Sequence, residues 1–476
     1  MAGYVEGVDR GQATLFPDRL DDFVDADSPV RVIDAFVDAL DLRELGFVRA
    51  VPTTMGRPGY DPAVLLKLYV YGYLNRIASS RRLEREAARN VELMWLIGRL
   101  APDHKTIADF WRDNGPAIRK VCSRFVLLCR KMGLFGDSVI AIDGSKFKAV
   151  NNRDQNFTPA KMERRLAEIE AAIGRYMAEM DGADATEPSA QASVEHLEQK
   201  LAVLHAYMAE LKVVDERLRA SHDGQVSLTD PDARSMNARG SGIVGYNVQA
   251  AVEAGHHLVV AHDVVTTGSD RAQLSTIARA AQEATGATKV EVVADRGYYS
   301  GPEVRTCEQA GISAHVVKPI TSNAVADGRF GKNDFVYDAL SDSYRCPAGE
   351  VLTRHCTSLE NGMRIGIYWT SGCGTCPMKK HCTTGKERRV RRWEHEHVLE
   401  AMEQRLARRP ELMRVRRSTV EHVFGTIKSW MGATHYLTRG LANVRTEMSL
   451  QVLAYNLKRV ISIVGITSLM AAIRAG

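Results

Sequence analysis

Two apolar runs that each end in an aspartate constrain the fold most strongly. Residues 139–142 read Val-Ile-Ala-Ile before Asp143, and Val290–Ala294 precede Asp295. Short apolar runs bounded by turn residues are typical of buried strands. Side chains at the ends of such strands project into the crevice where ligands bind. The pair therefore predicts a site at one sheet edge, although an Asp-Gly after a strand also forms an ordinary turn.

The region around these runs is patterned as an α/β domain. Tyr246–Val252 and His257–Val265 flank a short turn containing Gly255 and predict a strand hairpin. Residues 271–284 predict a helix, and Ala314–Val317 a fifth strand. We expect a mixed sheet flanked by helices, with its first part in residues 136–330. Three histidines in or beside the hairpin are interpreted as surface or packing residues: His256, His257 and His262.

Residues 1–135 predict an all-helical N-terminal domain. Asp27-Ser28-Pro29 and Asp61-Pro62 each combine an N-cap with a proline in the first turn. A basic cluster that includes Arg81 and Arg82 follows the second of these helices. Short helices with surface arginines suit a DNA-binding module, but such bundles also serve purely structural roles.

Two segments interrupt or extend the predicted sheet. Within residues 155–228, apolar residues recur at helical and then heptad-like spacing, which predicts an antiparallel helical hairpin. This hairpin is either a dimerisation or docking arm or a structural one. The second segment, residues 331–385, is rich in cysteine.

The cysteine-rich segment suggests a zinc site. Cys373 and Cys376 form a C-x2-C pair, which places two thiolates on one ion. Cys346 and Cys382 complete four thiolate ligands, with Cys356, His355 and His381 as substitutes. Four thiolates leave no open coordination position, so the role would be structural. The alternative is a set of reduced thiols, because the gap after Cys346 is long for a zinc ribbon.

Positive charge is concentrated in residues 386–476. This stretch carries 17 Lys and Arg against 8 Glu, a net charge of +9, while the whole chain carries +5. Such a gradient predicts a surface for a polyanion or, alternatively, a solvated helical face. The candidate DNA contacts here are Arg388, Arg389, Arg391, Arg392, Trp393, Arg414 and Arg416. With neither a signal peptide nor an apolar run long enough to span a bilayer, a cytoplasmic protein is expected.

A third acid lies on a predicted helix in the same stretch. At about 100° per residue, Arg417, Glu421 and Lys428 lie along one border of the apolar stripe of this helix. An exposed Arg–Glu pair would explain the first two but not the repeat at Lys428. Three carboxylates can hold two Mg²⁺ ions about 4 Å apart, which activate the attacking oxygen and stabilise the leaving one in phosphoryl displacement. Arg417 and Lys428 would position flanking phosphates or Glu421.

The joint order of these motifs resembles the DDE transposases of bacterial insertion sequences. Asp143-Gly144-Ser145, Asp295-Arg296-Gly297-Tyr298 and Arg417-x3-Glu421-x6-Lys428 are similar to the three carboxylate motifs of that family. Residues 229–234, 245–247 and the N-terminal segments at 56–60, 79–84 and 103–106 also resemble it. One departure is Arg414, where many relatives have a tyrosine thought to help place a flipped base.

The resemblance implies a ribonuclease H-like core in which Asp143, Asp295 and Glu421 are catalytic and hold Mg²⁺ or Mn²⁺. Arg296 joins Arg417 and Lys428 as a supporting residue. It further implies cleavage at terminal inverted repeats and joining of 3′-hydroxyl ends to target DNA, by a dimer or higher oligomer. Two alternatives stay open: a catalytically silent DNA-binding protein derived from a transposase, and a ribonuclease H-like nuclease without strand transfer.

Overall fold

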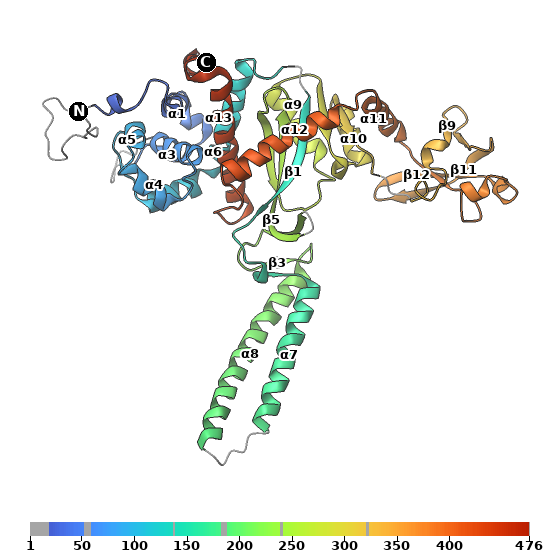
Figure 1. The fold of residues 1–476 in the computed structure, drawn as a ribbon, viewed down its shortest axis with the longest axis horizontal. Coiled ribbons are helices and arrows are strands. Elements are labelled where there is room, and N and C mark those ends of the chain that lie inside the picture. Colours follow the sequence, from blue (N-terminus) through green and yellow to red (C-terminus); the bar gives the residue numbers. More distant parts are fainter. Residues whose placement is uncertain are drawn as a thin grey trace, which may run out of the picture.

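The computed structural model describes residues 19–51, 59–136, 139–181, 188–238, 241–319 and 323–475. The motif at 56–60 therefore lies mostly outside the described residues. The molecule has a central body, a long helical arm on one side, and a separate β-sheet lobe at the end opposite the N-terminal helices (Figure 1).

The N-terminal domain is helical, as predicted. After a short 3-10 turn, its helices are α1 (Pro29–Asp38), α2 (Leu42–Leu45), α3 (Pro62–Leu74), α4 (Ser80–Ala87), α5 (Val91–Leu96) and α6 (His104–Lys131). Ser28, Asp61 and Asp103 each accept a backbone N–H of the helix that follows, which satisfies donors that a helix start leaves unpaired.

The central sheet has the mixed order expected of a ribonuclease H-like core. Its strands are β1 (Ile140–Lys148), β4 (Arg234–Ala238), β5 (Ser241–Glu253), β6 (Val259–Val265), β7 (Val290–Ala294) and β8 (Ile312–Val316). β1 pairs antiparallel with β5 and parallel with β7, and β7 pairs parallel with β8. β4 and β6 both pair with β5. The predicted hairpin is β5 and β6, and the predicted fifth strand is β8.

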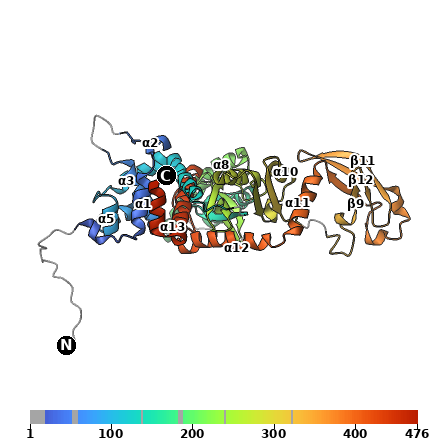
Figure 2. The same cartoon turned by 90° about the horizontal axis from the view of Figure 1, so that it is seen from above.

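Helices cover both faces of this sheet, and the sheet separates two hydrophobic cores. One face, with Ile140 and Ile142, packs against α9 (Leu274–Thr285), α10 (Gly301–Gln309) and α11 (Glu396–Arg408). The other, with Ala141 and Phe147, packs against α12 (Leu412–Gly425), which runs along the body (Figure 2). Alternate residues of β1 thus face different cores, and Asp143 lies on the α12 side.

The final helix, α13 (Leu441–Ala475), joins the sheet to the N-terminal domain. It packs against α1, α3 and α6 and against β6. The Asn456 amide bonds both the N–H and the C=O of Val259. By length and composition α13 also passes as a candidate membrane span. Its first half is nevertheless buried, and we interpret that half as a core helix. The apolar window that passes this test is 28% buried, and Gly465, at φ 77°, interrupts the helical backbone.

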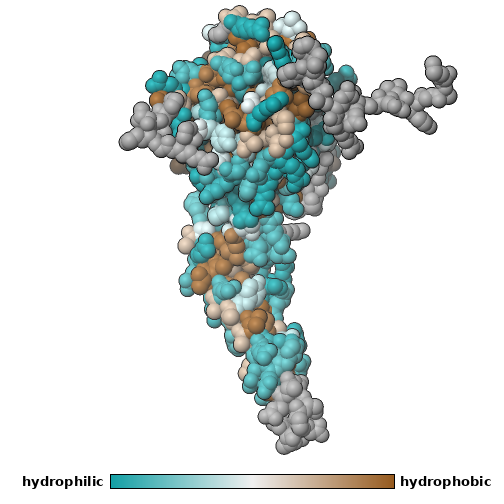
Figure 3. Space-filling model, turned by 90° about the vertical axis from the view of Figure 1, so that its left-hand side faces the viewer, coloured by the Kyte–Doolittle hydropathy of each residue, from teal (hydrophilic) through white to brown (hydrophobic). Residues whose placement is uncertain are grey.

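Both insertions have defined structures. β2 (Asn156–Phe157) and β3 (Val226–Ser227) form the base of an arm made of α7 (Pro159–Asp181) and α8 (Pro188–Ala220), which is the predicted helical hairpin. Apolar patches lie along its surface (Figure 3). Met177, Val203 and Val213 are 53%, 68% and 58% exposed, which leaves apolar surface for contact with another molecule.

The cysteine-rich lobe is an antiparallel sheet of β9 (Val336–Asp338), β10 (Ser343–Arg345), β11 (Val351–Glu360), β12 (Met363–Trp369) and β13 (Val390–Trp393). β13 pairs with β12, so the lobe extends past the predicted boundary at residue 385. Its core is small and consists mainly of aromatic side chains.

The pH dependence of stability should depend on His262. Its Nε2 lies 2.9 Å from the Ser449 hydroxyl of α13, and burial lowers its pKa to about 4. The unfolded chain, in which the pKa is about 6.5, binds more protons between these values. The free energy of unfolding should therefore fall as the pH drops from about 6.5 to about 4.

His262→Gln should make this slope shallower in urea titrations. Equal slopes for the variant and the wild type would contradict the assignment. Some slope should remain, because burial also lowers the pKa values of His257 and His422.

Candidate active site

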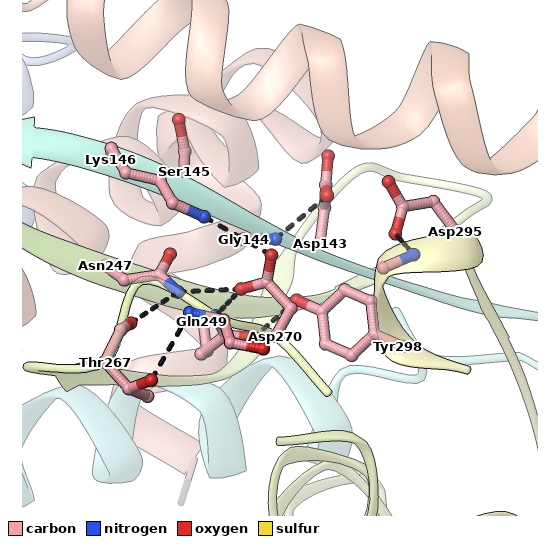
Figure 4. A network of polar contacts seen from close by, with 12 residues as sticks. Asp143, Gly144, Ser145, Lys146, Asn247, Gln249, Thr267, Asp270, Asp295 and Tyr298 are labelled. Atoms are coloured by element: carbon pink, nitrogen blue, oxygen red, sulfur yellow. Dashed lines mark hydrogen bonds and ion pairs between the residues drawn. The ribbon is translucent and has the colours of Figure 1, made fainter. Parts of the chain in front are cut away.

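Strand register brings the first two predicted acids to the same level. Ala141 pairs with Val293 in the parallel β1–β7 ladder, so Asp143 and Asp295 each follow two residues later. Neighbouring strands lie about 4.8 Å apart. Both carboxylates point to the same side of the sheet, away from Asp270 (Figure 4). Asp295 also caps the short turn Arg296–Tyr298, accepting the Gly297 N–H at 2.8 Å.

Arg416 of α12 reaches both carboxylates. Its Nη2 lies 2.7 Å from Asp143 Oδ1 and 3.7 Å from Asp295 Oδ2. The Arg416 side chain is only 13% exposed. One positive charge therefore balances two acids just beyond the end of the β1–β7 ladder. Asp295 follows β7, but Asp143 lies inside β1, which continues to Lys148, so the prediction that Asp143 follows its strand was wrong.

The two acids differ in exposure, which affects their charge. The side chains of Asp143 and Asp295 are 23% and 40% exposed. Burial raises the pKa of Asp143 to about 6; Arg416 opposes this shift, and the neighbouring Asp295 adds to it. Any additional positive charge nearby would favour the ionised form of Asp143, and a metal ion is the strongest such source of charge.

A polar network supports β1 from the opposite face. Asp270 Oδ1 accepts the side-chain amides of Asn247 and Gln249, each at 2.7 Å, and Asp270 Oδ2 lies 3.3 Å from Lys146 Nζ. The Gln249 carbonyl oxygen in turn accepts the hydroxyl of the fully buried Tyr298 (Figure 4). The network ties β1 and β5 to the turn after β7, and so holds the backbone that carries the two acids.

Gly144 leaves the room that this network needs. A Cβ there would lie 2.5 Å from Asp270 Oδ1 and 2.7 Å from Gln249 Nε2. Gly144→Ala should therefore displace β1 and cost about 1–3 kcal/mol of unfolding free energy, measured by urea titration. The matched control is Gly174→Ala in α7, where nothing lies within 4 Å of the added Cβ. Equal effects of the two changes would show that the close approach is unimportant.

The third predicted acid, Glu421, lies on the helix that covers the site but does not touch the aspartates. It is exposed, and in the described part of the chain it has neither a hydrogen bond nor an ion pair. Five residues separate it from Arg416, about 7.5 Å along the helix axis and about 140° around it. The α12 side chain that contacts Asp143 and Asp295 is thus Arg416, which the sequence had assigned to a DNA-facing surface.

Lys428, the last residue of the predicted signature, contacts β1. Its ammonium group donates to Ser145 Oγ at 2.6 Å and to the Lys146 carbonyl at 2.8 Å. It also lies 4.4 Å from the centre of the Phe147 ring. The π-helical turn Thr426–Trp430 changes the helical phase between Glu421 and Lys428. Lys428 therefore holds α12 against the strand of Asp143.

Two other predicted DNA contacts are buried. Arg392 is 9% exposed; its guanidinium stacks on the Tyr337 ring at 3.6 Å and pairs with Glu400. Trp393 is 6% exposed and packs into the core beside α10 and α11. Their burial argues against both predicted contacts, because this basic run is a strand of the β-sheet lobe with one buried face. Arg388 is half-buried over Phe335.

The remaining predicted phosphate contacts are exposed. They lie on α4, after β7, on or beside β13, and on α12: Arg81, Arg82, Arg296, Arg389, Arg391, Arg414 and Arg417. Arg389 pairs with Glu387, and Arg391 with Glu360.

Four cysteines of the lobe surround one small cavity. Cys346, Cys373, Cys376 and Cys382 line a space of about 20 Å³, enough for a single small occupant. Burial raises the pKa of Cys382; Arg388 opposes this, and the other three thiols add to it. Cys356 is exposed on β11 and His355 stacks on Trp369, so neither belongs to the set. Over the described ranges, no group of His, Cys, Asp or Glu, including this one, is arranged as a ready metal site.

The sequence interpretation missed Asp270 and the role of Arg416. Asp270 follows β6 in an irregular loop, where periodicity gives no signal. Arg416 could be recognised only by knowing which side of its helix meets the sheet.

Family models match two parts of the chain. A family described as "Transposase domain (DUF772)" matches residues 18–113, and one described as "Transposase DDE domain" matches residues 345–461. Both matches are to transposase families, and together they support a DDE-type transposase. The DDE match includes Glu421 and Arg416 of this transposase, whereas Asp143 and Asp295 lie between the two matched ranges.

Other comparisons add little. None of the curated proteins matches this transposase. A cryo-EM structure of the piggyBac transposase synaptic complex with hairpin DNA is 7% identical, with a TM-score of 0.33, over 95% of this chain and 79% of that one. That likeness is too loose to bear on fold or function.

Proposed function

We propose that this transposase serves an insertion sequence, cutting DNA at terminal inverted repeats and joining the 3′-hydroxyl ends to target DNA. The observation that carries this is the pair of carboxylates, Asp143 and Asp295, level on adjacent strands and bridged by one guanidinium nitrogen. Two acids gathered around one cation beyond the end of the β1–β7 ladder provide the charge pattern that phosphoryl transfer needs.

The donor chemistry of this site fits a hard divalent cation, Mg²⁺ or Mn²⁺. Both side chains supply carboxylate oxygens, and the position between them already holds a positive charge. A bound pair of ions would supply activation of the attacking oxygen and stabilisation of the leaving one. The protein's contribution is to hold the carboxylates at one level through the β1–β7 register and the Asp270 network.

In this proposal Glu421 completes the ligand set. It is exposed on the helix whose Arg416 contacts both aspartates, but about 140° around that helix from Arg416, so sharing an ion with them requires α12 to change its orientation. Arg417, one turn before it, would position phosphates, as Arg296 would beside Asp295, while Lys428, predicted for the same role, instead holds α12 against β1.

DNA is the proposed partner along two basic surfaces. Arg81 and Arg82 on α4 would contact transposon ends, and Arg414 and Arg417 would guide the strand to the acids. Contacts of this kind make binding salt-dependent. The exposed apolar side chains of the arm favour its use in a protein contact, and we propose a dimer on paired ends, acting in the cytoplasm.

We also propose a structural zinc ion in the lobe. Cys346, Cys373, Cys376 and Cys382 supply four thiolates around one cavity of suitable size.

A strand-transfer assay tests the proposed function. A duplex carrying the element's end and a free 3′-hydroxyl is mixed with target DNA, protein and Mg²⁺. Joined products are expected. Cutting without joining would favour a ribonuclease H-like nuclease, and binding without cutting would favour a catalytically silent DNA-binding protein. Inverted repeats in the DNA flanking the gene would identify the element.

A further inference from the structure

The guanidinium of Arg416 lies where the proposed function needs a metal ion. One of its nitrogens contacts carboxylate oxygens of both Asp143 and Asp295, and the side chain is 13% exposed. Its Nε is buried and, among the described atoms, has no hydrogen-bond partner. A buried charge with an unsatisfied donor is costly unless its charge partners hold it in place.

This arrangement has two consequences. Two carboxylates on adjacent strands repel each other, and the guanidinium reduces that repulsion while no metal is bound. The same guanidinium also competes with a metal, since a divalent ion cannot occupy the space between the oxygens while Nη2 lies 2.7 Å from one of them. Metal loading therefore requires Arg416 to withdraw.

The surroundings of Arg416 suggest where its guanidinium moves when it leaves the two carboxylates. Arg417, the next residue of α12, is exposed about 100° around the helix from Arg416, so a DNA strand that binds there brings phosphates close to the base of the Arg416 side chain. A guanidinium fork pairs with phosphate as well as with carboxylate, and Nε would then gain a partner.

We propose that Arg416 is a resident counter-ion that occupies the cation position in the DNA-free protein and transfers to a DNA phosphate when metal and DNA load. This inference rests on the proposed function. It makes metal affinity depend on DNA, which would limit loading of the site away from its substrate.

The test is Mn²⁺ binding to the full chain, followed by electron paramagnetic resonance, with and without a DNA duplex. Without DNA, Arg416→Gln should bind Mn²⁺ on the order of tenfold more tightly than the wild type. DNA should raise the affinity of the wild type by a similar factor and that of the variant much less. Arg408→Gln, which removes the same charge from an exposed position at the end of α11, is the matched control and should leave the DNA-free affinity within about twofold of wild type.

Equal DNA-free affinities of Arg416→Gln and the wild type would overturn the inference. If Arg416→Gln does not fold without metal, Arg416→Met is measured instead. It keeps most of the aliphatic side chain but removes the charge, so tighter Mn²⁺ binding is still expected, and an unchanged affinity rejects the proposal. Asp143→Asn distinguishes failure of the proposed function from failure of the counter-ion inference alone. Mn²⁺ binding that this change does not affect would refute the proposed function, whereas loss of binding together with equal affinities at position 416 refutes only the counter-ion.

Discussion

Asparagine in place of Asp143 or Asp295 is expected to lower the rate of DNA cleavage about 10³-fold, equivalent to about 4 kcal/mol of transition-state stabilisation. Asparagine preserves the size of the side chain and one oxygen but removes the negative charge that would hold a cation. The effect should appear in both cleavage and joining, because one site serves both steps in the proposed function. Rates are measured on a labelled duplex at saturating protein, so that weaker DNA binding does not contribute.

The control for this experiment is Asp327→Asn. Asp327 is an exposed acid that pairs with Arg329, and no role in the candidate site is assigned to it. It should retain the wild-type rate. Thermal unfolding of each variant must also be followed, since Arg416 loses an ionised partner when either aspartate is neutralised. A folded Asp143→Asn or Asp295→Asn protein that still cleaves at the normal rate would contradict the assignment of that acid.

Removal of zinc is expected to have the largest effect on stability. The β-sheet lobe has a core of only five fully buried apolar side chains, Phe335, Tyr344, Leu352, Tyr368 and Val390. A core of this size is too small to stabilise a domain by itself. Structural zinc contributes roughly 10–16 kcal/mol of binding free energy in small domains. Cys373→Ser with Cys376→Ser, or a strong chelator, should therefore abolish a separate thermal transition of the lobe.

Two measurements check this prediction: the zinc content of the purified protein and its calorimetric unfolding profile. Cys356→Ser is the matched control, because this cysteine is exposed on β11 outside the cavity. It should leave both measurements unchanged. One zinc per chain is expected for the wild type. A metal-free wild type that unfolds in the same way with and without chelator would exclude the site.

Much of the fold could be predicted because its signals are local. The run Val290–Ala294 is a strand with the predicted bounds, and the helical hairpin follows directly from apolar spacing. The proximity of Asp143 and Asp295 also followed from sequence, because each acid ends an apolar run and the two runs pair in parallel, although β1 itself continues to Lys148.

The surroundings of the remaining site residues depended on tertiary packing and could not be predicted from sequence. Periodicity placed Arg417, Glu421 and Lys428 along one helix border but could not show that Arg416 faces the sheet. The basic run near Arg392 has the composition of a surface, yet its planar guanidinium is buried by stacking on Tyr337. Asp270 lies in a loop, and only the folded chain brings it beneath Gly144.

The place of α13 bears on how the protein is made. This helix, the last in the chain, packs between the sheet and the first helices, so the bundle near the N-terminus is closed by residues from the far end of the polypeptide. A nascent chain that stops short of Leu441 leaves the apolar faces of α1, α3 and α6 without their cover. The helix α12, which carries Arg416 and Glu421, is also synthesised only shortly before that point. A product that ends before α12 thus lacks both the cover of these helices and Arg416, the α12 side chain that contacts Asp143 and Asp295.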